Sequence, residues 1–210
     1  MLSFIENIGL ILQRYGAVFA QGLWNTLWLS FVSVFLGTFL GILVALGKLS
    51  RHKLLNGVVS TYIEIIRGTP ILLQLYFFWL ALPNILPSIS DTTCILSALV
   101  VNASAYIAEV IRAGIQAVDA GQREASLSLG MTERAIMTKV IFPQAIKNIL
   151  PALGNEVIVM IKQTSLASVF FFGELMTAYK QVQSTTFLAL EPLTISGLIY
   201  LFLTVTLSRI

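Results

Sequence analysis

Four long stretches without a charged residue constrain this chain more than any other feature of its sequence. They lie between Arg14 and Lys48, Arg67 and Asp91, Asp91 and Glu109, and Glu191 and Arg209. A helix needs roughly 20 mainly apolar residues to cross a bilayer. Each stretch is mainly apolar and about that length or longer. The pattern therefore predicts four transmembrane helices.

A fifth span is expected over 145–165, although Lys147, Glu156 and Lys162 interrupt it. Only 11% of the residues are charged and 57% are hydrophobic, whereas soluble domains carry roughly 25% charged residues. We therefore expect an all-α polytopic membrane protein in which 1–210 form one domain. Its five transmembrane helices are predicted at roughly 17–47, 57–82, 92–114, 145–165 and 190–209, with a polar insert at 119–143.

The basic residues indicate which loops face the cytoplasm. The first loop holds Lys48, Arg51 and Lys53, and five more basic residues lie in or beside the insert: Arg112, Arg123, Arg134, Lys139 and Lys147. The loop at 83–90 has none. Cytoplasmic loops are enriched in Lys and Arg, so we predict that the first loop, the insert and the C-terminus are cytoplasmic and the N-terminus is outside. The net charge of +3 thus reports topology, and no nucleic-acid partner is expected.

Catalytic and metal-binding patterns are missing from the sequence. Cys94 is the one cysteine, so a disulfide framework or a metal-thiolate site within the chain is excluded. The one histidine, His52, lies in a basic loop, and no G-x-S-x-G motif accompanies it. We expect neither an enzyme nor a metal site. No cleavable signal peptide is recognised, and apolar residues at helical spacing over 4–15 predict a segment along the outer interface.

Three features within the spans predict local structure. Gly37-x-x-x-Gly41 is a small-residue pattern that lets helices approach closely, and we expect it to serve packing inside the chain. Pro70 is expected to kink or break the second span. Glu64 with Arg67, and Glu109 with Arg112, stand three residues apart and share helix faces. Both pairs are interpreted as structural ion pairs.

The insert reads as two short helices joined by a turn. Asp119–Gly121 begins it as a turn or N-cap, and 124–129 is expected to be a helix that ends at Gly130 in a left-handed conformation. Thr132 can cap the next helix, and Pro143 marks entry into the fourth span. The stretch SLSLGMTERAI also has the pattern of a DNA-binding turn, but spans begin too close on either side for a duplex to reach it.

The insert resembles the EAA loop of ABC-importer permeases. That signature is Glu-Ala-Ala, three residues, Gly, nine residues and Ile-x-Leu-Pro. Here Glu124-Ala125-Ser126, Gly130 and 140–143 (VIFP) match it at every spacing, with mild changes at Ser126, Val140 and Phe142. The resemblance to the polar-amino-acid branch covers nearly the whole chain, including GLWNTLWLSFVSVFLGTFLGILVAL, YIEIIRGTPILLQL, AYIAEVIRAGI, GQREAS and LGNEVIVMIKQTSLAS.

The resemblance implies a type I ABC-importer permease in a bacterial plasma membrane. Its expected partners are a cytoplasmic ABC ATPase, a second permease subunit (identical or different) and an extracytoplasmic substrate-binding protein. ATP and Mg²⁺ would be bound by the ATPase, and this chain would carry no cofactor. The residues expected to couple it to the ATPase are Glu124, Ala125, Ser126 and Gly130. The cargo would be a polar amino acid, with a basic one among the options.

Polar residues within the fourth span are candidates for the substrate pathway, because ionisable side chains are costly in the membrane and usually face the protein interior. They are Asn155, Glu156, Lys162, Gln163, Thr164 and Ser165. The same residues can instead pair structurally between helices. Glu174, Tyr179 and Lys180 are placed on the outer side, where they contact a binding protein or only water.

One other transport class is compatible with the spans. An ATP-independent secondary transporter or channel subunit would also have apolar helices and buried charges. Such transporters usually carry internal repeats, which this sequence lacks, and the polar insert would have no role in them. Transport that continues after ATP depletion would favour this alternative.

Overall fold

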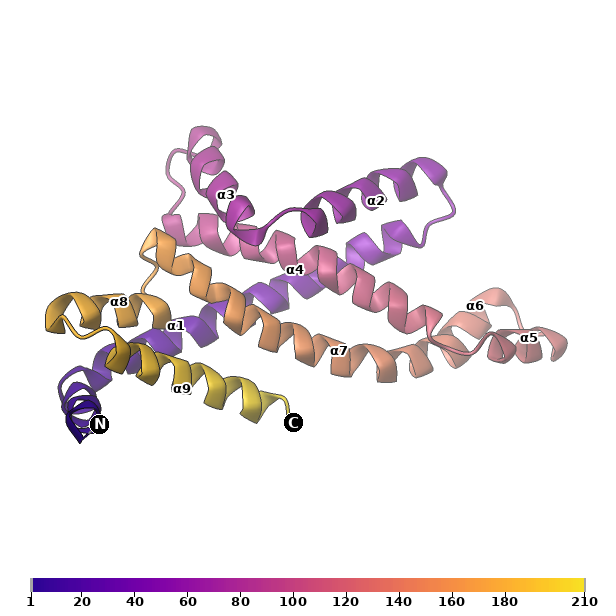
Figure 1. Cartoon of the computed structure of the whole chain (residues 1–210). Coiled ribbons are helices and arrows are strands. Elements are labelled where there is room, and N and C mark those ends of the chain that lie inside the picture. The colour runs from indigo at the N-terminus through magenta and orange to yellow at the C-terminus, as the bar shows by residue number, and fades with distance from the viewer. Residues whose placement is uncertain (1, 210) are drawn as a thin grey trace. The chain divides into compact units, whose positions relative to one another are not determined.

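The computed structural model describes residues 2–209, and within them every regular secondary-structure element is a helix, with short turns and loops between the helices. The long helices are α1 (Leu2–Lys48), α2 (Lys53–Gly68), α3 (Ile71–Ile85), α4 (Asp91–Gln116), α7 (Phe142–Gln163), α8 (Leu175–Thr186) and α9 (Leu190–Leu207). The polar insert holds α5 (Ala120–Ser128), α6 (Glu133–Ile136) and a π-helical turn, η1 (Met137–Ile141); a 3₁₀ segment, η2 (Thr164–Phe170), follows α7. Figure 1 shows the course of the chain.

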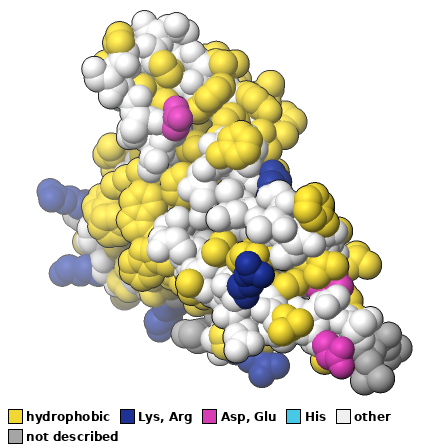
Figure 2. All heavy atoms as spheres, turned by 90° about the vertical axis from the view of Figure 1, so that its left-hand side faces the viewer, with side chains coloured by type: hydrophobic (Ala, Val, Ile, Leu, Met, Phe, Trp, Pro, Cys, Tyr) yellow, Lys and Arg dark blue, Asp and Glu magenta, His cyan; other side chains and the backbone are white. Residues whose placement is uncertain are grey.

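Three of these helices, α1, α4 and α9, are each long and apolar enough to cross a membrane. Two bent pairs meet the same criterion when each pair is taken together: α2 with α3, and the helical run Glu133–Phe170 with α8. Counting each pair as one span gives five. Hydrophobic side chains also cover much of the face seen in Figure 2, as contact with lipid favours.

The expected break at Pro70 is confirmed. Helix α2 ends at Gly68, and its C-cap residue Thr69 is extended, with φ −114° and ψ 144°. A residue before proline avoids the helical region because the proline ring clashes with it. The chain resumes as α3 at Ile71. The second predicted span is therefore two helices.

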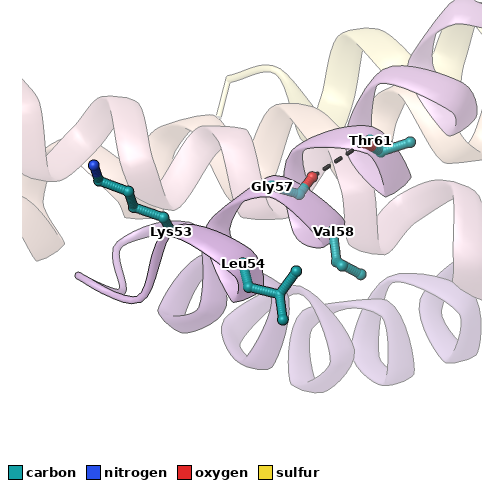
Figure 3. Close-up of a pocket in the computed structure, with 5 residues that line it drawn as sticks. All are labelled: Lys53, Leu54, Gly57, Val58 and Thr61. Carbon is teal, nitrogen blue, oxygen red and sulfur yellow. Dashed lines mark hydrogen bonds between the residues drawn. The ribbon is translucent and has the colours of Figure 1, made fainter.

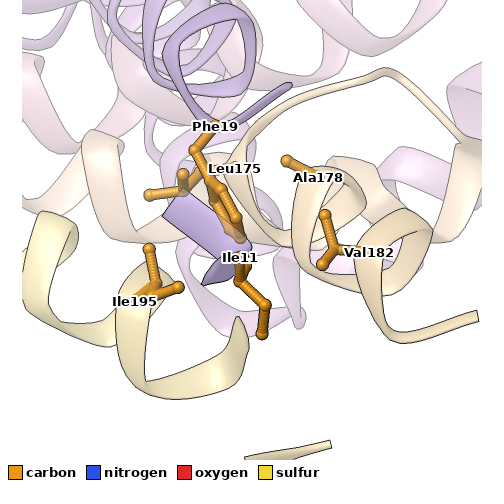
Figure 4. Packing of buried hydrophobic residues seen from close by; sticks show 6 residues of the cluster. All are labelled: Ile11, Phe19, Leu175, Ala178, Val182 and Ile195. Carbon is orange, nitrogen blue, oxygen red and sulfur yellow. The ribbon is translucent and has the colours of Figure 1, made fainter. Parts of the chain in front are cut away.

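The first helix is longer than the predicted span. Helix α1 contains 47 residues without a break, about 70 Å at 1.5 Å per residue. The segment over 4–15 is therefore part of the same continuous helix as the first predicted span. Within 4–15, Ile11 is buried and Ile8 and Tyr15 pack partly buried against the same cluster, whereas Ile5 and Leu12 are exposed. Ile11 and Phe19 are buried in α1 and belong to the cluster drawn in Figure 4, together with Leu175, Ala178, Val182 and Ile195 of α8 and α9.

The chain divides into two compact units, each made of separate segments. Unit 1 consists of Met1–Ser33, Ile71–Leu99 and Val157–Ile210, and unit 2 of Val34–Pro70 and Val100–Glu156. In unit 1, α1 and α8 come close because Gly22 has no side chain. A Cβ there would lie 3.0 Å from the Cβ of Ala178 and 3.1 Å from the Cα of Leu175. The hydroxyl of Thr26 accepts the Leu175 N–H at 3.1 Å, so this close contact is also polar.

In unit 2, glycines likewise allow α1 and α4 to approach each other closely. A Cβ at Gly37 would lie 2.6 Å from the Cβ of Ala103, and one at Gly41 would lie 2.9 Å from Cγ2 of Ile107. The small-residue pattern therefore packs two helices of the same chain, as expected. Beside it, α2 contributes the buried Ile63 to a cluster with Ala45 and Ala108.

Candidate functional site

The insert begins with a capped helix. Asp119 is the N-cap of α5, and its carboxylate accepts the Gly121 N–H at 2.7 Å. The first N–H groups of a helix have no partner within the helix, so an aspartate at this position stabilises the helix start. The expected N-cap is thus confirmed. Figure 1 shows α5 and α6 together at the junction between α4 and α7.

A Schellman motif ends α5. The Gly130 N–H donates to the Leu127 carbonyl at 2.9 Å and the Met131 N–H to the Ser126 carbonyl at 3.1 Å, which is the hydrogen-bond pattern of this motif. Gly130 has φ +73°, a conformation that costs a residue with a Cβ about 1–2 kcal/mol. Glycine is therefore the residue that the turn requires, as the sequence predicted.

The second half of the insert is held to the first by caps and charge. The Thr132 hydroxyl accepts the Ala135 N–H at 3.4 Å and caps α6. Arg123 of α5 pairs with Glu133 of α6 through two hydrogen bonds, at 2.5 and 3.3 Å. Both side chains are about half exposed, so screening makes this pair worth at most about 1 kcal/mol. Its effect is to orient α5 against α6.

The surface of α5 combines small, acidic and apolar side chains. Glu124, Ala125 and Gly130 are exposed. Ser126 is only 6% exposed, and its hydroxyl donates to the Gln122 carbonyl at 2.6 Å; in the isolated chain it packs within the insert. Leu129 is 82% exposed. The exposed side of α5 therefore carries apolar as well as polar side chains.

The sequence analysis did not identify Leu129 and the half-exposed Leu127 as part of the exposed surface of the insert. The signal was present, because both leucines interrupt an otherwise polar helix. Their exposure could not be inferred, since leucines at this spacing also serve as the packed face of a short amphipathic helix.

The insert continues into α7 through the π-helical turn. The Phe142 N–H bonds the Met137 carbonyl five residues earlier. Pro143 follows as the second residue of α7, and because the helical run from Glu133 continues through the π-turn, this proline removes one N–H donor from that run. Such π-turns are rare and often lie at functional sites. The expected entry into the fourth helix at Pro143 is confirmed.

The six predicted pathway residues divide between the two units. Asn155 and Glu156 belong to unit 2, and the other four belong to unit 1: Lys162, Gln163, Thr164 and Ser165. Thr164 is buried, and its hydroxyl donates to the Ile161 carbonyl at 2.8 Å. The Ser165 hydroxyl donates to the Lys162 carbonyl at 2.6 Å. These local bonds accompany the change from α-helix to 3₁₀-helix at Thr164.

Two of the predicted residues line a hollow of about 460 Å³ in unit 1. Its lining is formed by Lys162, Ser165, Leu166, Ser168, Met176, Lys180 and Tyr200. The Lys180 ammonium donates to the carbonyl and the hydroxyl of Ser168, at 3.2 and 3.1 Å. The ammonium groups of Lys162 and Lys180 and the hydroxyl of Ser168 around one hollow can bind a carboxylate. The contribution of Lys180 and Ser168 was not foreseen.

A buried carboxylate in unit 1 has a structural role. Glu174 caps α8 by accepting the N–H groups of Met176 and Thr177 at 2.7 and 2.8 Å. The Tyr200 hydroxyl donates to the same carboxylate at 3.0 Å. The expectation that Glu174 contacts a binding protein or water on the outer side is therefore wrong, because the residue has no exposed surface.

Unit 2 contains a cluster of charged residues in which Arg67 pairs with a different residue from the one predicted. Glu109 pairs with Arg112 at 2.7 Å, as predicted. Arg67 lies 3.5 Å from Glu109 and above the ring of Tyr106 at 5.3 Å. The predicted Glu64–Arg67 pair is therefore wrong: in the part of the chain that the structure describes, the ion pair of Arg67 is with Glu109. The ring and the carboxylate together hold the guanidinium on α4.

Apolar helices of membrane-crossing length and one exposed, capped polar insert are the features of a membrane-embedded protein. Residues 37–210 match the family described as binding-protein-dependent transport system inner membrane component, and the chain belongs to this family.

Relatives and solved structures agree with this assignment. The arginine transport system permease protein ArtQ of Bacillus subtilis is 39% identical over 90% of this chain and 87% of its own length. The nopaline transport system permease protein NocM of Agrobacterium fabrum is 35% identical over 97% and 88%. The crystal structure of an amino acid ABC transporter with histidines is 48% identical over 95% of this chain and 94% of that one, with a TM-score of 0.92.

A more distant structure supports the fold alone. The MetNI methionine ABC transporter, in an inward-facing conformation, is 21% identical over 91% of this chain, with a TM-score of 0.70. The chain therefore has the fold of a type I ABC-importer permease, and its role is that of the membrane component in binding-protein-dependent transport. The expected fold class is confirmed.

Proposed function

We propose that this chain is the permease subunit of an ATP-driven importer that moves a polar amino acid delivered by an external binding protein. Family membership supports the transport role. Relatives named for arginine, nopaline and glutamine transport support an amino acid as cargo. A basic amino acid is the first substrate to test, because an arginine transport permease is among the most similar relatives.

The chain transports and does not hydrolyse ATP. In this proposal, a separate cytoplasmic ATPase binds ATP and Mg²⁺, and its closure moves the insert. Glu124, Ala125 and Gly130 form the coupling contact through the exposed side of α5. Ser126 supports that contact from below by packing against the insert. The single observation that carries the proposal is this rigidly capped, exposed α5 in a chain that is otherwise apolar.

The pathway is proposed to include the polar residues of α7 and η2. Lys162 and Ser165, with Lys180 across the same hollow, are suited to the carboxylate of an amino acid. Asn155, Glu156, Gln163 and Thr164 complete the proposed set. Substitution of Lys162 is expected to raise the substrate concentration needed for transport while leaving ATPase capture unchanged.

The arrangement in the membrane follows the distribution of basic residues. We propose one permease domain over 1–210, with five spans at about 17–47, 57–82, 92–114, 145–165 and 190–209. The N-terminus lies outside, and the insert at 119–143 and the C-terminus lie in the cytoplasm of a bacterium. A second permease subunit, identical or related, completes the pathway.

Capture of the ATPase tests the proposal. The tagged chain is purified from its native membrane in mild detergent, beside a Glu124→Arg/Ala125→Leu variant. Both side chains are exposed, so the variant changes the surface of α5 without disturbing its packing. We expect the unaltered chain to retain an ABC ATPase and the variant to lose most of it, as measured by quantitative mass spectrometry.

The matched control is Glu6→Arg/Ala17→Leu, which makes the same two changes at exposed positions of α1. This control should retain the ATPase. Equal retention by both variants would show that the coupling surface is elsewhere. If no ATPase accompanies the unaltered chain, the importer proposal fails, and uptake after ATP depletion should then be measured for an ATP-independent transporter.

A further inference from the structure

The N-terminal half of α2 carries an apolar hollow that the transport mechanism does not use. It measures about 440 Å³ and is lined by Lys53, Leu54, Gly57, Val58 and Thr61. Figure 3 shows Leu54 and Val58 on one side of the helix, while the aliphatic stem of Lys53 carries its ammonium away from them. The hollow therefore has an apolar floor and a cationic end.

The side chains at the hollow are open to the surroundings of the protein. Leu54 is 83% exposed and Val58 is 62% exposed. With Thr61 and Ile65 they form a stripe at helical spacing along α2. The opposite face of α2 is already occupied, because Ile63 is buried against Ala45 and Ala108. The exposed stripe is thus a second apolar face of the same helix.

The cationic end contains charges that the chain itself does not neutralise. Arg51 and Lys53 are exposed, and neither forms an ion pair within the residues that the structure describes. Lys48, by contrast, is held by the Ser60 hydroxyl at 2.5 Å. Arg51 and Lys53 therefore stand at the N-terminal end of the apolar stripe, Arg51 in the loop before α2 and Lys53 as the first residue of α2.

This combination selects one kind of molecule. A phosphate group is matched by the two cations, and an acyl chain by the apolar stripe. Gly57 leaves room for such a chain, because a Cβ at this position would have no neighbour within 4 Å. Clusters of basic residues beside a membrane helix attract anionic lipids, at about 1 kcal/mol per Lys or Arg. A free phosphate would make no contact with the apolar stripe, and an uncharged lipid would make no ion pair with the two cations.

We propose that α2 binds one anionic phospholipid, with its headgroup phosphate at Arg51 and Lys53 and an acyl chain along Leu54, Gly57 and Val58. The site is distinct from the insert and from the pathway hollow. It rests on the membrane placement in the proposed function but not on the ATPase partner or the cargo. The lipid would cover the exposed face of α2 in the leaflet that contains the first loop.

Competition between lipids tests the site. The purified transporter, with whatever partners it retains, is placed in nanodiscs that contain spin-labelled phosphatidylglycerol or spin-labelled phosphatidylcholine with identical acyl chains. We expect the motionally restricted fraction to favour phosphatidylglycerol. Arg51→Gln/Lys53→Gln should lower the affinity of this site for phosphatidylglycerol, relative to phosphatidylcholine, by roughly thirtyfold. Gly57→Leu should displace the lipid by filling the space for its acyl chain.

Two controls separate the site from general effects. Lys139→Gln/Lys147→Gln removes the same charge at exposed positions elsewhere and should keep the preference. Gly197→Leu adds the same side chain to α9, where a Cβ also has no neighbour, and should keep it too. If Arg51→Gln/Lys53→Gln keeps the preference, or if both charge variants lose it equally, the proposal is wrong.

Another protein on this face would also overturn the proposal. A Val58→Cys variant tests this, because the one native cysteine, Cys94, is buried. Crosslinking of Cys at position 58 to a second permease or to the ATPase in the assembled transporter would assign the face to that partner. ATPase capture through α5 is measured separately, so failure of the lipid site leaves the proposed function intact.

Discussion

At the scale of single residues, Glu109 has the most consequential contacts in unit 2. Its carboxylate accepts three hydrogen bonds from the Arg112 guanidinium, at 2.7, 3.0 and 3.1 Å. It also lies 3.5 Å from Arg67. Two arginines thus share one carboxylate, and removal of that carboxylate would leave two like charges close together.

We predict that Glu109→Gln lowers the thermal unfolding temperature by several degrees, corresponding to about 1–3 kcal/mol. The figure is below the cost for a fully buried pair because the Arg67 and Arg112 side chains are 43% and 30% exposed. Unfolding in detergent, followed by tryptophan fluorescence, measures this temperature. Adding Arg67→Gln should recover part of the loss because it removes one of the two like charges. A double variant that loses the sum of the single effects would show that the residues are uncoupled.

At the scale of elements, the close approach of α1 to α4 depends on glycine. A Cβ at Gly37 would stand 2.6 Å from the Cβ of Ala103, and neither atom can move without its backbone. The helices would therefore have to separate. At a helical position where a Cβ would meet no neighbour, alanine is instead the better helix former by about 1 kcal/mol.

Gly37→Ala is expected to destabilise the chain by about 1–3 kcal/mol, the usual cost of overpacking. Gly197→Ala is its matched control. It makes the same substitution at a helical position where a Cβ has no neighbour within 4 Å, and it should be neutral or stabilising by up to about 1 kcal/mol. Both variants are compared by unfolding temperature. Equal effects at the two positions would show that α1 and α4 do not pack through Gly37.

At the scale of the whole molecule, this chain has more apolar surface than it can bury. Large hydrophobic side chains are exposed along α1, α3 and α9, including Phe35, Phe77 and Phe202. Such a surface suits contact with lipid and with other membrane helices. Five membrane-crossing segments are also few for enclosing a polar pathway. Both considerations support the proposal of a second permease subunit.

We predict that the chain purified in mild detergent carries a protein mass of at least twice 23.0 kDa after the detergent contribution is subtracted. Multi-angle light scattering measures that mass, and mass spectrometry shows whether the second permease is identical or related. A single copy that still transports amino acids in proteoliposomes with the ATPase would contradict the prediction.

The features that the sequence determined by itself are those set by neighbours along the chain. Helix breaking at Pro70 depends on the proline ring and the residue before it. The cap at Asp119 and the turn at Gly130 depend on backbone groups within five residues. The Glu109–Arg112 pair needs only one helical turn. Apolar stretches of membrane length can be recognised from composition alone, so the sequence also predicted a helical membrane protein.

Tertiary structure decided which distant residues meet. Arg67 pairs with Glu109 instead of Glu64 because the packing of α2 on α4 places a carboxylate and an aromatic ring beside it. Glu174 is buried because Tyr200 of α9 packs over the cap of α8, and Ser126 is buried where α5 packs against α6 and η1. Spacing along the chain defines a helix face, but the partner of that face depends on how the helices pack.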